Sequence, residues 1–121
     1  MPAFPGMNAI VTGGAGGIGG ACARALAKKG ASVLIADLDE DAAKRLAEQL
    51  RKDRGTAQAF GLDVRNRASV EKMVAMAEDS FGQLHIVIHA AGIGIERGVL
   101  ETSLEDWEKV ISINLTGSFL V

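Results

Sequence analysis

Residues 8–19 read Asn-Ala-Ile-Val-Thr-Gly-Gly-Ala-Gly-Gly-Ile-Gly, an apolar run that ends in glycines and leads into a helical pattern. The pattern predicts a strand, a tight turn and a helix, the local geometry that binds the pyrophosphate of a dinucleotide. Glycine suits this turn because a β-carbon would disfavour its backbone angles and would keep the main chain away from phosphate oxygens. The residues that carry this prediction are Thr12, Gly13, Gly17, Ile18 and Gly19.

A second apolar run, 32–36, ends at Asp37, about twenty residues beyond the glycines, where an acidic side chain can accept hydrogen bonds from ribose hydroxyls. This pairing makes dinucleotide binding a more specific prediction than a plain strand-to-helix turn. A nucleoside triphosphate loop would need Gly-Lys-Ser/Thr after its final glycine. Here Gly20 and Ala21 follow Gly19, which excludes that class of site.

The composition favours one compact domain over residues 1–121, since 48% of the residues are hydrophobic. The net charge of −2, with both signs interspersed, argues against nucleic acid or an anionic membrane as a partner and favours a small molecule. The sequence shows no signal peptide and no apolar run of about 18 residues, so we expect a cytoplasmic protein. The lone Cys22 and two isolated histidines predict neither a disulfide nor a metal site.

Short apolar runs alternate with amphipathic stretches, which is typical of an α/β fold with a parallel sheet covered by helices on both faces. We expect strands at 8–12, 32–37, 57–62 and 86–90. Helical spacing predicts one buried face on each of three intervening helices. These faces are Ile18, Ala21, Cys22, Ala25 and Leu26; Ala43, Leu46, Ala47 and Leu50; and Val70, Met73, Val74, Ala77 and Phe81.

Helix start signals agree with these boundaries. Asp39 and Asn66 can cap the second and third helices, and Thr102 with Glu105 forms a candidate capping box. A further helix is expected to begin near Ser103. Its predicted buried residues are Leu104, Trp107, Val110 and Ile111.

Several of these motifs, taken together, resemble the short-chain dehydrogenase/reductase family in order and spacing. They are Thr12-Gly13-x-x-x-Gly17-Ile18-Gly19, Asp37, Asp63-Val64, His89-Ala90-Ala91-Gly92 and Asn114. The resemblance implies a Rossmann-type doubly wound parallel sheet, incomplete, with about four strands in the order 3-2-1-4. It covers only the first half of a family member, and the chain stops in an apolar helical pattern. We therefore expect a domain truncated within the helix that follows Asn114.

The resemblance also assigns roles to residues. It implies that Asp63 and Val64 contact adenine, that His89, Ala90, Ala91 and Gly92 support the sheet and the cofactor, and that Leu38 and Ile113 border the cofactor. Asp63 could instead cap a strand end. His89 stands where the family usually has asparagine, so a plain hydrogen bond at a strand end is the alternative to cofactor contact. Asn114 matches a catalytic asparagine that bends a helix and helps to hold a relay water, and a simple helix kink or cap remains the alternative.

The family's catalytic serine, and its tyrosine followed four residues later by lysine, would lie beyond residue 121, and this sequence contains no tyrosine. Only Asn114 is therefore assigned as catalytic. Charge favours NAD over NADP, because a 2′-phosphate would meet the like charge of Asp37 while Leu38 and Gly16 supply no cation. Use of both cofactors remains the alternative.

Three functions stay open at this point. The first is an NAD-dependent oxidoreductase acting on an alcohol or carbonyl substrate, present as an inactive cofactor-binding half. The second is a dinucleotide-binding module without catalysis. The third is an interaction module, because a sheet that ends at its fourth strand leaves an uncovered edge. The expected partner is a second copy or a complementing C-terminal half.

Overall fold

The computed structural model describes residues 3–121 as a four-stranded parallel sheet with the strand order β3-β2-β1-β4. The strands are β1 (Asn8–Thr12), β2 (Ser32–Asp37), β3 (Thr56–Gly61) and β4 (Ile86–His89). The α/β class and the strand order predicted from the sequence are confirmed. In the register of the sheet, Thr12 lies between Ala36 and His89, so three strands end side by side at one edge.

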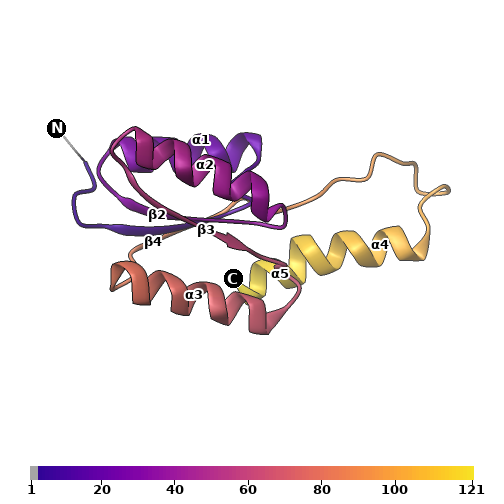
Figure 1. Cartoon of the computed structure of the whole chain (residues 1–121). Coiled ribbons are helices and arrows are strands. Elements are labelled where there is room, and N and C mark those ends of the chain that lie inside the picture. The colour runs from indigo at the N-terminus through magenta and orange to yellow at the C-terminus, as the bar shows by residue number, and fades with distance from the viewer. Residues whose placement is uncertain (1–2) are drawn as a thin grey trace.

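Helices cover both faces of this sheet (Figure 1). One face carries α1 (Gly17–Lys28) and α2 (Glu40–Lys52), and the other carries α3 (Arg67–Phe81) and the C-terminal α5 (Gly117–Leu120). Two hydrophobic clusters form the core, one on each side, because alternate strand residues point to opposite faces.

The chain leaves β4 through a long loop that reaches away from the sheet and returns along one continuous helical arm (Figure 1). This arm consists of α4 (Leu104–Ile111), a π-helical turn η1 (Ser112–Thr116) and α5. Single π-helical turns inside α-helices often mark functional sites. The arm thus brings Asn114, at the centre of η1, back toward the carboxyl edge of the sheet.

Two of the three predicted caps are confirmed. The side chain of Asp39 accepts from the amide of Ala42 at 3.0 Å, and that of Asn66 accepts from Ser69 at 3.1 Å. The third was wrong. Ser103 caps α4, while the hydroxyl of Thr102 donates to the carbonyl of Gly98 at 2.8 Å and so serves the preceding turn.

The predicted buried face of α2 is confirmed, and Val70, Met73 and Ala77 of α3 are buried as expected. The prediction for α1 was largely wrong, because only Leu26 of its predicted face is buried and Ile18 is 79% exposed. The side of α1 that faces the core consists of Gly19, Gly20, Ala23 and Leu26. Apolar periodicity missed this side because glycine carries no hydrophobic signal, although it allows the closest packing.

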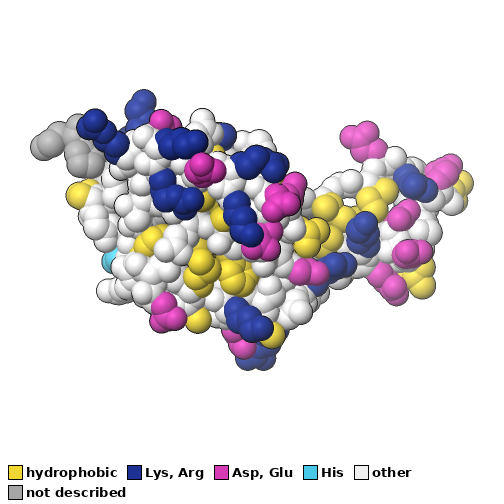
Figure 2. All heavy atoms as spheres, in the orientation of Figure 1, with side chains coloured by type: hydrophobic (Ala, Val, Ile, Leu, Met, Phe, Trp, Pro, Cys, Tyr) yellow, Lys and Arg dark blue, Asp and Glu magenta, His cyan; other side chains and the backbone are white. Residues whose placement is uncertain are grey.

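The prediction that α4 is buried was also wrong. Leu104 is 71% exposed and Trp107 is 59% exposed, because α4 lies on the arm and apart from the sheet. Figure 2 shows hydrophobic side chains at the surface of this arm, among charges of both signs. Within residues 3–121 we find no helix whose length and apolar character would let it cross a membrane.

Candidate functional site

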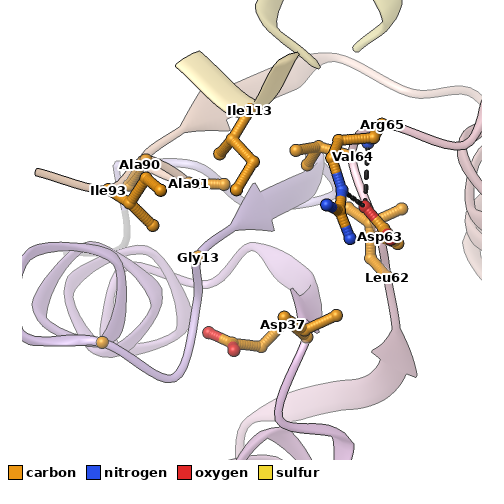
Figure 3. Close-up of a pocket in the computed structure, with 13 residues that line it drawn as sticks. Gly13, Asp37, Leu62, Asp63, Val64, Arg65, Ala90, Ala91, Ile93 and Ile113 are labelled. Carbon is orange, nitrogen blue, oxygen red and sulfur yellow. Dashed lines mark hydrogen bonds and ion pairs between the residues drawn. The ribbon is translucent and has the colours of Figure 1, made fainter. Parts of the chain in front are cut away.

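A cavity of about 280 Å³ lies at the carboxyl edge of the sheet. Its wall combines the glycine loop after β1, the ends of β2 and β3, the loop after β4, and η1 (Figure 3). The residues that line it are Gly13, Gly16, Asp37, Leu38, Leu62, Asp63, Val64, Arg65, Ala90, Ala91, Gly92, Ile93 and Ile113. Crevices at this edge of an open parallel sheet are where α/β proteins bind ligands.

The glycine loop is held by contacts that a side chain would block. Gly13 has a φ of +60°, and a β-carbon there would lie 2.7 Å from the amide nitrogen of Ala91. A β-carbon on Gly19 would collide with the carbonyl of Gly13. These two glycines therefore shape the loop by letting backbone pack on backbone.

Gly17 differs, because a β-carbon there would meet no atom of the chain within 4 Å. It begins α1, whose N-cap residue Gly16 makes no side-chain capping bond and whose first turn has no acidic residue. The first amides of a helix lack partners within the helix and carry partial positive charge. Open space beside uncapped amides fits an anion close to the backbone.

Asp37 ends β2 and ties the loop to the neighbouring turn. One of its carboxylate oxygens accepts from the amide of Ala15 and the other from the amide of Asp39, each at 3.0 Å. A carboxylate offers about four acceptor positions. Asp37 therefore keeps capacity for further donors at the cavity wall.

On the far wall, Asp63 and Arg65 form a close ion pair (Figure 3). The Nε of Arg65 donates to one carboxylate oxygen of Asp63 at 3.0 Å, and its Nη2 donates to the other at 2.8 Å. These hydrogen bonds hold the pKa of the Asp63 carboxyl below its usual value. Among residues 3–121, Arg65 is the one basic side chain that lines the cavity, and its charge is already paired.

Asn114 anchors η1 to the loop after β4. Its Oδ1 accepts from the amide of Ile93 at 2.9 Å, and its Nδ2 donates to the carbonyl of Ile93 at 2.8 Å. One turn later, a β-carbon on Gly117 would lie 2.7 Å from Cγ2 of Val64. The arm therefore packs closely against Val64, one of the residues that line the cavity.

The comparisons with known proteins agree with this geometry. The family model described as short chain dehydrogenase matches residues 7–121. The chain belongs to the short chain dehydrogenase family. The chain is 41% identical to D-threitol dehydrogenase of Mycolicibacterium smegmatis, over 96% of this chain and 45% of that protein. It is 33% identical to meso-2,3-butanediol dehydrogenase of Serratia marcescens, over 89% of this chain and 42% of that protein.

Among solved structures, a citronellol catabolism dehydrogenase (AtuB) from Pseudomonas aeruginosa matches with a TM-score of 0.92 and 31% identity. That match covers 99% of this chain and 49% of the other. The chain thus spans about half the length of the short chain dehydrogenases that it matches.

Most of the residues that were predicted to bind the cofactor line the cavity. Those that line it are Gly13, Asp37, Leu38, Asp63, Val64, Ala90, Ala91, Gly92 and Ile113. The predicted cofactor residues outside the lining are Thr12, Gly17, Ile18, Gly19 and His89, and Asn114, the residue predicted as catalytic, also lies outside it. Four lining residues were not predicted as site residues from the sequence, although each is next to a predicted one: Gly16, Leu62, Arg65 and Ile93.

His89 is not among the residues that line the cavity, and its ring contacts two hydroxyl groups instead. Its Nδ1 lies 2.6 Å from the hydroxyl of Thr12, and its Nε2 lies 3.1 Å from the hydroxyl of Ser118. Burial lowers the pKa of His89. Within residues 3–121, no three His, Cys, Asp or Glu side chains are grouped so as to hold a metal ion.

Proposed function

We propose that this chain is the nucleotide-binding part of a short chain dehydrogenase that transfers hydride between NAD and an alcohol or carbonyl substrate. The observation that carries the proposal is that the glycine loop, Asp37 and the pair Asp63–Val64 all border the same cavity. Each side of that cavity offers the chemistry that one part of a dinucleotide requires.

The pyrophosphate is assigned to the amides at the start of α1. They have no capping side chain and no acidic neighbour in the first turn, and Gly17 leaves open space beside them. Backbone N–H groups at a helix N-terminus bind phosphate through hydrogen bonds and the helix dipole together.

The adenosine is assigned to the opposite walls. Asp37 accepts from the ribose hydroxyls with the acceptor positions that Ala15 and Asp39 leave available. Asp63 and the backbone of Val64 contact adenine. The preference for NAD follows from charge, because a 2′-phosphate would meet the like charge of Asp37, while the charge of Arg65 is already shared with Asp63.

When bound, the nicotinamide group accepts or donates the hydride. The proton that accompanies this transfer needs an acid/base on the substrate oxygen, and the sequence has no tyrosine to match the one used in the family. We therefore assign this chain cofactor binding and, through Asn114, the positioning of the helical arm. Turnover requires the serine, tyrosine and lysine from outside these 121 residues.

The substrate class proposed is a compound with a hydroxyl-bearing carbon. Relatives of this chain are named for D-threitol, for meso-2,3-butanediol and for a dichlorocyclohexadiene diol. These names support an alcohol as substrate. The loop after β4 lines the same cavity through Gly92 and Ile93, and so could border the substrate as well as the cofactor.

Isothermal titration calorimetry of the chain with NAD, NADH and NADP tests the proposal. We expect NAD and NADH to bind, NADP to bind more weakly, and no alcohol oxidation unless a second chain with the family's serine, tyrosine and lysine is added. Absence of binding by every nucleotide at millimolar concentration, with well-folded protein, would refute it.

A second function, pairing with another polypeptide, is supported by the helical arm. Leu104, Trp107, Leu115 and Phe119 are each more than half exposed, and Phe119 reaches 86%. Large apolar side chains exposed along one helical arm favour association. Sedimentation analysis should show self-association that Trp107→Ser weakens, whereas a monomer at all concentrations, unaffected by the substitution, would rule out self-pairing.

A further inference from the structure

We infer that His89, as the neutral tautomer with its hydrogen on Nε2, is a positioning residue that joins the carboxyl end of β1 to the helical segment carrying Asn114. The bridge itself follows from side-chain geometry alone. Its consequence for the cofactor cavity rests on the function proposed above.

The bridge connects three distant parts of the chain. Thr12, fully buried at the end of β1, lies 2.6 Å from Nδ1 of His89 at the end of β4. Nε2 of the same ring lies 3.1 Å from the hydroxyl of Ser118 in α5. The hydroxyl of Ser118 in turn donates to the backbone carbonyl of Asn114 at 2.5 Å.

The Ser118–Asn114 contact decides which atom carries the hydrogen between Ser118 and Nε2 of His89. A carbonyl oxygen has no hydrogen, so two oxygens this close must share the hydrogen of the Ser118 hydroxyl. Serine has only one such hydrogen. The hydroxyl of Ser118 can therefore only accept from His89, and Nε2 of His89 must carry a hydrogen.

The other ring nitrogen is then an acceptor when the ring is neutral. Nδ1 accepts from the hydroxyl of Thr12, whose oxygen also lies 3.4 Å from the amide of Ala91, a donor. Every hydrogen in the series thus points one way, from Ala91 to Asn114. The lowered pKa of His89 supports the neutral ring.

Asparagine, which the family usually has here, can make only half of this bridge. The terminal atoms of asparagine match the position of Nδ1 of histidine but fall short of Nε2, whereas those of glutamine reach the Nε2 position. Of histidine, asparagine and glutamine, only histidine has hydrogen-bonding atoms at both of these positions. The sequence departure at position 89 therefore adds a link to Ser118 that asparagine lacks.

With the added link, η1 is attached at two places. The side chain of Asn114 bonds to Ile93 in the loop after β4. The backbone carbonyl of Asn114 is linked through Ser118 to His89, at the end of β4. Because Ile93 and Ile113 line the cavity, the bridge fixes the distance between the glycine-loop side and the arm side of the candidate site.

The first test is the tautomer of the wild-type protein, read from long-range ¹⁵N–¹H correlation spectra of the two histidines. His85 is an internal reference, because its Nδ1 accepts from the backbone amide of Asn8 at 3.0 Å. We expect His89 to show the same pattern, with a bare Nδ1 and a protonated Nε2. A ring protonated at Nδ1, or at both nitrogens near neutral pH, would overturn the inference.

The second test measures hydrogen exchange of the η1 and α5 amides in variants. Ser118→Ala and His89→Asn should each speed exchange about threefold to tenfold, the value of one hydrogen bond, and the double variant should add nothing further. Ser118→Thr and His89→Gln should keep the contact at Ser118. Ser112→Ala is the matched control, because the Ser112 hydroxyl donates to the carbonyl of Lys109, so its hydrogen bond stays within the arm.

Additive effects of Ser118→Ala and His89→Asn, or an equal effect of Ser112→Ala, would overturn the bridge. NAD affinity is measured separately on the same variants, and we expect it to fall severalfold in Ser118→Ala. If the wild type binds no nucleotide, the proposed function fails while the tautomer and the exchange data still decide the bridge.

Discussion

The carboxylate of Asp37 accepts a hydrogen bond from the backbone amide of Ala15 at 3.0 Å, so the residue proposed to hold ribose also holds the glycine loop. The second oxygen accepts from Asp39, the residue that caps α2. Ribose recognition and loop geometry therefore depend on the same side chain. Experiments at position 37 must therefore distinguish the effect of losing the negative charge from the effect of disordering the glycine loop.

Asp37→Ala should weaken NAD binding by about tenfold to a hundredfold, the value of hydrogen bonds to a charged group, and should weaken NADP binding less. Asp37→Asn is the matched control, because its amide oxygen can still accept from Ala15 while the negative charge is gone. We expect this variant to narrow the difference between the cofactors in calorimetry. Equal weakening of both cofactors by Asp37→Ala would contradict the charge-based preference.

Gly17→Val and Gly19→Ala should fail for different reasons. A side chain at position 17 projects into open space, so we expect loss of nucleotide binding with little change in the urea midpoint. A β-carbon at position 19 collides with the carbonyl of Gly13, so this variant should lose stability and binding together. Normal NAD affinity in Gly17→Val would contradict the proposal that the pyrophosphate binds at the start of α1.

Arg65→Gln should raise the pKa of Asp63. In the wild type, the hydrogen bonds from Arg65 hold that pKa below the usual value. A lowered pKa in the folded state stabilises the protein above the usual carboxyl pKa, and this contribution disappears as the pH falls through the folded-state value. NMR titration of the carboxyl carbon should show the rise, and stability at and below the usual carboxyl pKa should depend less on pH in the variant. An unchanged Asp63 titration would mean that the ion pair does not persist in solution.

Gly117→Ala should destabilise the chain by about 1 to 3 kcal/mol, the usual cost of overpacking. Its β-carbon would lie 2.7 Å from Cγ2 of Val64, which pushes the arm away from the end of β3. Val64→Ala removes that methyl group and should recover part of the loss in the double variant. Independent effects in urea unfolding would show that the two residues do not touch.

Much of the local structure could be predicted from short-range features of the sequence. The runs 8–12 and 32–37 are apolar at their centres, 9–11 and 33–36, and turn residues follow them, so their strands could be placed to the residue. Asp39 and Asn66 were identifiable as caps because capping depends on neighbours three residues away.

The groups that meet across the carboxyl edge of the sheet depend instead on how the whole chain folds. The contacts of His89 with Ser118, and of Val64 with Gly117, join residues far apart in the chain through the path of one helical arm. The exposure of Trp107 and Ile18 likewise depends on what lies opposite each helix. Hydrophobic periodicity records which side of a helix is apolar, but the path of the chain decides whether anything covers that side.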